Sequence, residues 1–278
     1  MPILNKDMQV CISLSARPSN LGTRFHNFLY DELGLNFVYK AFSTTDLEGA
    51  IRGMRALNFR GCSVSMPFKE DVIALVDNMA PSALAIESVN TIVNDNGVLT
   101  ASNTDYEAVL TLLKDRQVDT GSSVLVRGSG GMAKAVVAAF REAGFTHLTV
   151  TARNEESGRA LAERYDFSFE SSDFLTSGRA GSEGFDVLVN VTPLGMSGPN
   201  ESDLSFPAEL IEQATTIIDV VAFPSDTPLI QAGHAAGTVI ISGAEVIALQ
   251  AALQFEAYTG VTLSADHVQR ASVFSRHA

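Results

Sequence analysis

A glycine-rich segment, Gly128-Ser129-Gly130-Gly131-Met132-Ala133, offers the clearest chemistry in this sequence. It lies between a run of apolar residues typical of a strand and an amphipathic pattern typical of a helix. In that context a glycine turn presents backbone N–H groups at a helix N-terminus, where they bind a pyrophosphate. Gly128 allows the tight turn, Gly130 leaves room for phosphates, and Ala133 stands where the dinucleotide fingerprint accepts glycine or alanine. We therefore expect a dinucleotide site here, the alternative being a tight turn without a ligand.

The residues after the next strand choose between cofactors. An acidic side chain there would accept a hydrogen bond from a ribose 2′-hydroxyl and would repel a 2′-phosphate. The sequence has Ala152-Arg153-Asn154 at this point, with no carboxylate and with a guanidinium that can fork onto phosphate. We therefore expect NADP rather than NAD. The alternative is that Arg153 is a solvated surface arginine.

Strand-like and helix-like patterns alternate through most of the chain, which predicts a mainly parallel sheet. We expect an α/β protein of two domains: an N-terminal α/β substrate domain with a mainly parallel sheet, and a Rossmann-like NADP-binding domain. Residues 1–105, completed by 245–278, form the first, and residues 106–244 form the second. A polar stretch from Lys114 to Ser122 is a candidate boundary between the lobes, and the C-terminal helices are expected to pack back on the first domain.

Two local patterns in the first lobe predict a hairpin turn and a helix. Asn94-Asp95-Asn96-Gly97 separates two strand-like runs and predicts a hairpin turn. Pro67 is placed where proline can open a helix, which predicts a helix running through Lys69 and Val72.

Composition excludes several classes of function. Apolar residues make up 46% of the chain and charged residues 18%, a balance that predicts a folded protein. The net charge of −13 argues against nucleic acid or anionic membrane as a partner. We expect no membrane span, a cytoplasmic location and reduced core thiols at Cys11 and Cys62. The five histidines show no metal-binding spacing, so we expect no metal site.

Three polar segments stand out in the first lobe, and their order is informative. They are the P-F-K-E run at 67–70, the E-S-V-N-T run at 87–91 and the N-T-D run at 103–105, followed by the G-x-G-G turn. This combination resembles the shikimate dehydrogenase family, and the resemblance spans nearly the whole chain. The family resemblance implies an NADP-dependent reduction of 3-dehydroshikimate to shikimate.

The resemblance also implies a catalytic pair, Lys69 and Asp105. Hydride addition to a ketone builds negative charge on oxygen, so an ammonium that donates a proton stabilises the transition state. An adjacent carboxylate orients the ammonium and accepts from the same hydroxyl. The alternative is a surface lysine and a helix N-cap.

Further site residues follow from the same resemblance. Ser65, Asn90 and Gln250 are expected to contact ring hydroxyls, and Asn190 and Thr192 to lie beside the cofactor. Further residues are expected to contact the cofactor: Met196, Val221 and Gly243, and, from the motifs above, Ser129, Gly131, Met132 and Asn154.

The match breaks in places that bear on the substrate carboxylate. The family's S-x-S pair reads Asn20 and Gly22 here, just before His26, so Asn20 and Ser15 are our candidates, with Ser13, Arg17 or Ser19 as alternatives. Ala222 replaces a tyrosine, Tyr106 replaces a glycine, and the second basic residue of the NADP clamp falls at Ser157. These changes suggest a divergent branch.

Competing functions differ in ligand and in class. The expected ligand is a small anionic carbocyclic acid: shikimate, 3-dehydroshikimate, quinate or an aminoshikimate. A non-catalytic NADP and cyclitol-acid sensor is a different class, and Lys69 and Asp105 count against it. A methyltransferase is disfavoured by Arg153, and we expect a monomer or homodimer.

Overall fold

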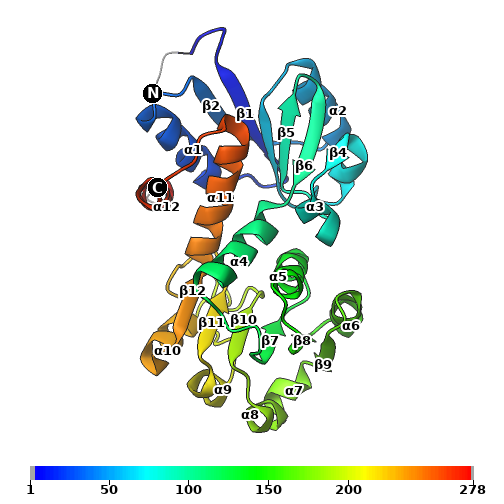
Figure 1. Ribbon diagram of the computed structural model, residues 1–278, viewed down its shortest axis with the longest axis vertical. Coiled ribbons are helices and arrows are strands. Elements are labelled where there is room, and N and C mark those ends of the chain that lie inside the picture. Colours follow the sequence, from blue (N-terminus) through cyan, green and yellow to red (C-terminus); the bar gives the residue numbers. More distant parts are fainter. Residues whose placement is uncertain (1–3, 277–278) are drawn as a thin grey trace. The chain divides into compact units, whose positions relative to one another are not determined.

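The computed structural model describes residues 4–276, which form two compact units, each with its own sheet (Figure 1). Unit 1 comprises residues 1–104 and 248–278, and unit 2 comprises residues 105–247. The α/β fold with two domains is confirmed. Among the described residues, no helix is long and apolar enough to cross a membrane.

Unit 1 is built on a mixed sheet of six strands in the order β2-β1-β3-β5-β6-β4. β1 runs parallel to β2 and β3, whereas β5 is antiparallel to β3 and β6. The expected hairpin joins β5 to β6, with Asn96 and Gly97 both at positive φ, as a tight turn between twisted strands requires. The strands are β1 (Gln9–Ser15), β2 (Phe37–Ser43), β3 (Gly61–Val64), β4 (Asn78–Met79), β5 (Thr91–Asp95) and β6 (Val98–Ser102).

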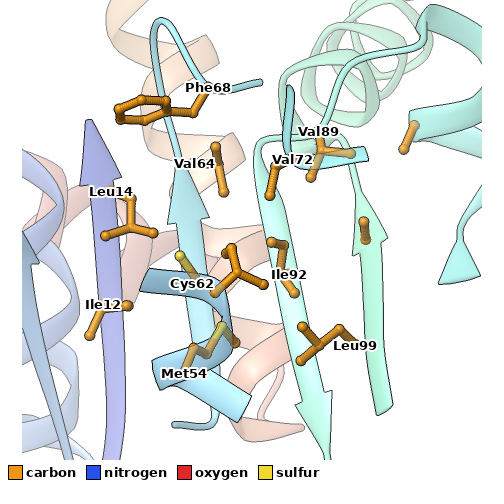
Figure 2. Close-up of a cluster of buried hydrophobic side chains, with 13 residues drawn as sticks. Ile12, Leu14, Met54, Cys62, Val64, Phe68, Val72, Val89, Ile92 and Leu99 are labelled. Atoms are coloured by element: carbon orange, nitrogen blue, oxygen red, sulfur yellow. The ribbon is translucent and has the colours of Figure 1, made fainter. Parts of the chain in front are cut away.

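Apolar side chains fill both faces of this sheet. On one face the cluster in Figure 2 packs Ile12, Cys62 and Ile92 from three strands against Met54 of helix α2 (Leu47–Ala56). On the other face Cys11 packs with aromatic side chains of α1 (Leu21–Glu32) and α11 (Gly243–Thr259). Both cysteines are free and buried, and burial raises the pKa of each thiol. They are core residues, in line with the sequence.

The C-terminal helix α12 (Ala265–Arg276) returns to unit 1, as expected, and packs on α1 (Figure 1). The Phe28 and Phe274 rings stack with centroids 4.9 Å apart. The guanidinium of Arg24 donates to the carbonyl of Phe274 through Nη2 at 3.0 Å. The end of the chain therefore completes the first domain.

The segment after β3 differs from the sequence prediction. No α-helix opens at Pro67; a turn covers residues 66–70 and a 3₁₀ helix, η1 (Asp71–Leu75), follows. The carbonyl of Lys69 accepts from the backbone N–H of Val89 at 2.8 Å instead of from a helical partner. This contact with a distant segment replaces the helical hydrogen bond and ties Lys69 to the start of β5. The short helix α3 (Pro81–Ile86) precedes Val89.

Unit 2 contains an all-parallel sheet of six strands in the order β12-β11-β10-β7-β8-β9. Both sides of such a sheet are buried, so its strands read as continuous apolar runs. Val124, Leu125 and Val126 are fully buried. The strands are β7 (Val124–Arg127), β8 (Leu148–Ala152), β9 (Ser168–Ser171), β10 (Val187–Asn190), β11 (Thr216–Asp219) and β12 (Val239–Ser242).

Helices connect these strands in the manner of a Rossmann-like fold (Figure 1). The helix expected after the glycine turn is α5, whereas β9 and the three short helices before β11 were not foreseen. The helices are α4 (Thr104–Asp115), α5 (Gly131–Glu142), α6 (Glu155–Arg164), α7 (Asp173–Thr176), α8 (Arg179–Glu183), α9 (Ala208–Gln213) and α10 (Pro228–Ala236).

The boundary between the units falls between Thr104 and Asp105 and again between Ile247 and Ala248. The polar stretch from Lys114 to Ser122 lies within unit 2 and is not the boundary. Tyr106 of α4 explains why: its hydroxyl lies near Glu142 and Tyr165 of unit 2, and burial followed by these neighbours raises its pKa to about 12. Helix α4 therefore belongs to the second unit from its first turn.

Candidate functional site

A pocket of about 380 Å³ lies at the carboxyl edge of the parallel sheet in unit 2. This edge is where open α/β sheets bind ligands. The glycine turn after β7, the loop after β8 and the loop after β10 all contribute to it. The lining residues are Arg127, Gly128, Ser129, Gly130, Thr151, Ala152, Arg153, Asn154, Ser172, Leu175, Val191, Thr192, Pro193, Leu194 and Asn200.

The glycines of the turn have separate roles. Gly128 has φ +123°, and a Cβ there would lie 2.8 Å from Cγ2 of Val191, so neither the backbone nor the packing accepts a side chain. At Gly130 a Cβ would project into open space, where it would occupy the pocket. Helix α5 begins at Gly131 without a side-chain cap, so the pocket is adjacent to its N-terminal N–H groups. This cradle fits a pyrophosphate.

The loop after β8 supplies a cation, and a pair of hydroxyls links the glycine turn to the helix that follows this loop. Arg153 is exposed and lines the pocket, while Asn154 caps α6 by accepting from the N–H of Ser157 at 3.1 Å. The hydroxyls of Ser129 and Ser157 lie 2.7 Å apart and link the glycine turn to α6. None of the lining residues carries a carboxylate, so the electrostatics of this end suit a phosphate.

A buried network holds the opposite wall of the pocket. Oδ1 of Asn190 accepts from both the N–H of Thr192, at 3.1 Å, and its hydroxyl, at 2.6 Å. Nδ2 of Asn190 donates to Leu194 at 3.1 Å and to Oδ1 of Asp219 at 3.0 Å. The turn from Thr192 to Leu194 is thus fixed from behind by an asparagine that does not itself line the pocket.

Asp219 anchors this network and was not foreseen from the sequence. Its carboxylate also accepts from the N–H of Val221 at 3.1 Å and from the hydroxyl of Thr227 at 2.5 Å. Burial raises the pKa of Asp219, and the donors of Thr227, Val221 and Asn190 partly oppose that rise. One carboxyl group therefore connects the ends of β10 and β11 to the start of α10.

In unit 1, Asn90 gathers the polar segments that the sequence singled out. Its Oδ1 accepts from the Thr91 hydroxyl at 2.8 Å, and from the N–H and hydroxyl of Thr104 at 2.8 and 3.2 Å. Thr104 directly precedes Asp105, and Val89, which binds the carbonyl of Lys69, directly precedes Asn90. The backbone at Lys69 and the backbone leading into Asp105 are thereby both tied to the start of β5.

Helix α11 adds two glutamines to this group. Oε1 of Gln250 lies 3.4 Å from the hydroxyl of Thr104. One turn later Gln254, which the sequence analysis missed, is buried and donates to the Thr91 hydroxyl at 3.0 Å and to the Asn90 carbonyl at 3.2 Å. A second glutamine four residues after the first, on a mostly apolar helix, was the available signal.

The remaining candidates of unit 1 lie at the carboxyl ends of β1 and β3. Ser65 is exposed and directly follows β3. Ser15 ends β1, and its hydroxyl is buried without a hydrogen-bond partner within residues 4–276. Asn20 is exposed at the N-cap of α1, and its side chain makes no capping hydrogen bond.

The expected cofactor residues divide into two groups. Gly128, Ser129, Gly130, Arg153, Asn154 and Thr192 line the pocket. Gly131, Met132, Ala133, Asn190, Met196, Val221 and Gly243 lie outside the lining. Gly243 has a packing role, because a Cβ there would lie 2.1 Å from the carbonyl oxygen of Val221. Arg127, Ser172, Leu175 and Asn200 line the pocket and were missed, since no local motif marks them.

Within the described part of the chain, no group of three or more His, Cys, Asp or Glu side chains is placed to hold a metal ion. His26 is fully buried in unit 1 and stacks on Tyr39 with ring centroids 4.4 Å apart. Burial lowers the pKa of His26 to about 3, and Gln254 partly opposes this. The imidazole is therefore a neutral core side chain.

Known proteins of one family resemble this chain over most of its length. Residues 18–92 match the family model described as the shikimate dehydrogenase substrate binding domain. The shikimate dehydrogenase-like protein of Haemophilus influenzae is 53% identical over 275 residues, covering 99% of each chain. The shikimate dehydrogenase (NADP(+)) of Chlorobaculum tepidum is 34% identical over 264 residues, covering 88% of each.

Solved structures agree with the sequence relatives. A shikimate 5-dehydrogenase-like protein has a TM-score of 0.94 at 52% identity, covering 99% of this chain and 100% of that one. Shikimate 5-dehydrogenase from Thermus thermophilus, solved with NADP(H) and shikimate, has a TM-score of 0.84 at 30% identity, covering 96% and 100%. The polar cluster at the start of β5, the glycine-lined pocket of the parallel sheet and these relatives together place the chain in the shikimate dehydrogenase family.

Proposed function

We propose that this protein is an NADP-dependent shikimate dehydrogenase, which reversibly reduces 3-dehydroshikimate to shikimate. The observation that carries the proposal is the composition of the pocket in unit 2. The glycine turn and Arg153 line one pocket that contains no carboxylate, and this combination suits a dinucleotide with a 2′-phosphate. NADPH supplies the hydride for the reduction.

Lys69 and Asp105 are the proposed acid–base pair. Lys69 donates a proton to the oxygen that gains negative charge, and Asp105 orients the ammonium and accepts a hydrogen bond. The contacts of unit 1 support this assignment, because Asn90 fixes Thr104 just before Asp105 and Val89 fixes the carbonyl of Lys69. In the oxidative direction the same lysine accepts the proton.

Polar side chains of unit 1 are proposed to bind the hydroxylated ring. Gln250 and Ser65 lie on the two segments that flank the Asn90 network. Asn90 uses its Oδ1 on three donors of the protein, so Nδ2 is the part of its amide for ring hydroxyls. The substrate carboxylate is assigned to Ser15 and Asn20, and the unpartnered hydroxyl of Ser15 supports the first of these.

The test of cofactor choice is a matched pair of titrations. The protein is titrated with NADP⁺ and NAD⁺ by calorimetry, in the wild type and in Arg153→Leu. We expect NADP⁺ to bind more tightly in the wild type and the preference to fall about tenfold in the variant, as loss of one charge-assisted contact implies. Equal binding of both cofactors by the wild type would contradict the NADP assignment.

Substrate choice is tested by following reduced nicotinamide with shikimate, quinate and aminoshikimate. The departures at Asn20 and Ala222 from the family pattern are the reason for including quinate and aminoshikimate as alternatives. We expect the highest turnover on shikimate. Turnover on quinate or aminoshikimate alone would transfer the activity to that substrate, and tight binding of NADP⁺ and shikimate without any turnover would favour a sensor.

A further inference from the structure

Arg127 is a charged residue in an otherwise apolar strand. It ends β7, a central strand, and pairs in register with Thr151 of β8 and Asn190 of β10. Side chains alternate along a strand, so Arg127 extends on the same face as Leu125. Leu125 belongs to the buried cluster with Leu175 and Phe206. The guanidinium therefore emerges beside an apolar core.

One contact fixes this side chain. Nη1 of Arg127 donates to the carbonyl oxygen of Ser205, in the segment between β10 and α9. The residue is half-buried, and burial lowers the pKa of its guanidinium. No carboxylate pairs with Arg127 in the part of the chain that the structure describes. A partly desolvated cation held by one neutral acceptor keeps most of its five N–H donors for another partner.

The pocket supplies the place for that partner. Arg127 lines it together with Leu175, Leu194 and Asn200, a mixture of apolar walls and polar donors. Arg153 lies on the neighbouring strand's loop, with the hydroxyls of Ser129 and Ser157 beside the glycine turn. The two guanidinium groups thus reach one pocket from different strands. Arg153 lies in the loop after β8, and Arg127 lies at the end of β7, on the face of Leu125 and of its cluster with Leu175, which we call the leucine-lined part.

The chemistry of the leucine-lined part suits a flat heteroaromatic ring. Such a ring packs its faces between apolar side chains, and a guanidinium binds either its electron-rich face or its ring nitrogens. A phosphate, in contrast, is bound by hydrogen-bond donors and cations and gains nothing from contact with leucine side chains. The cofactor has two flat rings. The nicotinamide ring of NADP⁺ is a cation that a guanidinium repels, whereas the adenine base is neutral and has acceptor nitrogens, so adenine is the ring that suits Arg127.

We propose that Arg127, fixed by the carbonyl of Ser205, binds the adenine base of the dinucleotide, independently of the 2′-phosphate that Arg153 selects. This inference rests on the proposed function, because it takes the pocket to hold a dinucleotide. It adds a second arginine whose contribution is common to all adenine-containing ligands.

The experiment compares Arg127→Leu with the matched variant Arg153→Leu, using calorimetric titration with three ligands. NADP⁺ contains adenine, pyrophosphate and 2′-phosphate; NAD⁺ lacks the 2′-phosphate; adenosine 2′-monophosphate lacks the pyrophosphate. We expect Arg127→Leu to weaken all three by about tenfold, because all three contain adenine. Arg153→Leu is expected to weaken only NADP⁺ and adenosine 2′-monophosphate.

Other outcomes separate the alternatives. If Arg127→Leu weakens NADP⁺ and NAD⁺ but not adenosine 2′-monophosphate, Arg127 acts on the pyrophosphate or on the nicotinamide half, and the inference is wrong. If NAD⁺ alone is unaffected, Arg127 binds the 2′-phosphate and the inference is again wrong. Unchanged affinity for all three ligands would also overturn it, while a wild type that binds none of them would overturn the proposed function itself.

A second variant controls for folding. Leucine at position 127 matches the apolar strand around it, and Arg127→Gln retains a hydrogen-bond donor for the carbonyl of Ser205. Both variants are expected to keep the wild-type circular dichroism spectrum and to show the same ranking of ligands. Should Arg127→Gln bind all three ligands as tightly as the wild type, a guanidinium contact with adenine would be excluded.

Discussion

Each unit places a buried asparagine beside one end of a strand, Asn90 just before β5 and Asn190 at the last position of β10. The two asparagines organise different kinds of site. Asn90 holds Thr91 and Thr104 through Oδ1, and the side chains it gathers come from β5, α4 and α11. Asn190 holds Thr192 and Asp219, and the wall it fixes adds to a pocket lined by the glycine turn and by the loops after β8 and β10. The first site is made of side chains distant in sequence, whereas the second is made of a short glycine turn and its neighbouring loops.

The difference between the two sites indicates which of them is expected to carry the chemical step and which is expected to bind the cofactor. Backbone N–H groups at a helix N-terminus bind an anion but do not exchange a proton in catalysis. Proton transfer needs titratable side chains held close together. When such side chains come from segments distant in sequence, the folded core has to bring those segments together. We therefore assign the chemical step to the residues anchored through Asn90 and the cofactor to the pocket anchored through Asn190.

The largest expected effect tests that division. Lys69→Ala and Asp105→Asn should each lower turnover by at least about a hundredfold, or about 2.7 kcal/mol in transition-state stabilisation. The dissociation constant for NADP⁺ should stay within about twofold of the wild type, since the pocket of unit 2 includes neither residue. Steady-state rates and calorimetry measure the two quantities. Near-wild-type turnover in either variant would remove that residue from the mechanism.

The sequence could predict the second site better than the first because its signals are local. The spacing of Gly128, Gly130 and Arg153 lies within 26 residues of chain and requires only a strand and a helix around it. Gln254 and Asp219 act through partners 163 and 29 residues away, and no local pattern announces such pairs. The helix expected at Pro67 failed for the same reason, because Lys69 bonds to Val89 rather than along its own segment.

Replacement of the two asparagines compares the sites directly. Asn90→Ala should lower the free energy of unfolding by about 3 kcal/mol, since the buried groups of Thr91 and Thr104 lose their acceptor. Turnover should fall while the affinity for NADP⁺ is retained. Asn190→Ala should instead weaken NADP⁺ binding by about tenfold. Urea unfolding, rates and calorimetry provide the measurements.

A matched control for Asn90 lies within β5, the strand that begins directly after Asn90. Asn94 is also buried, but its Oδ1 accepts only from the N–H of Gly97 in the hairpin, at 2.7 Å. Asn94→Ala is expected to cost about 1 kcal/mol of stability and to leave turnover unchanged. Equal losses of turnover in the two variants would mean that Asn90 acts only by stabilising unit 1.

The buried ionisable groups of the two units respond to pH in opposite directions. The pKa of His26 is lowered to about 3, so its contribution to stability is present above its ordinary pKa near 6.5 and is lost as the pH falls. Between pH 7 and pH 5 this loss should be about 2 kcal/mol. His26→Phe, which keeps the ring stacked on Tyr39, should flatten that part of the profile in urea unfolding. An unchanged slope would show that the pKa of His26 is the same in the folded and unfolded states.

Asp219 gives the smallest expected effect and the opposite sign. Its pKa is raised, so its contribution is fully present below its ordinary pKa and is lost as the pH rises through the folded value. The hydroxyl of Thr227 opposes that rise by donating to the carboxylate and also caps α10 by accepting from Ile230. Thr227→Val should therefore cost about 1 kcal/mol at pH 4 and more at pH 8, because the ionised carboxylate loses a donor. Thr215→Val is the control: its hydroxyl donates to the backbone carbonyl of Asp186, which does not titrate. If the cost of Thr227→Val does not grow with pH relative to this control, Asp219 stays protonated throughout, and the wall of the cofactor pocket is held by a neutral carboxylic acid.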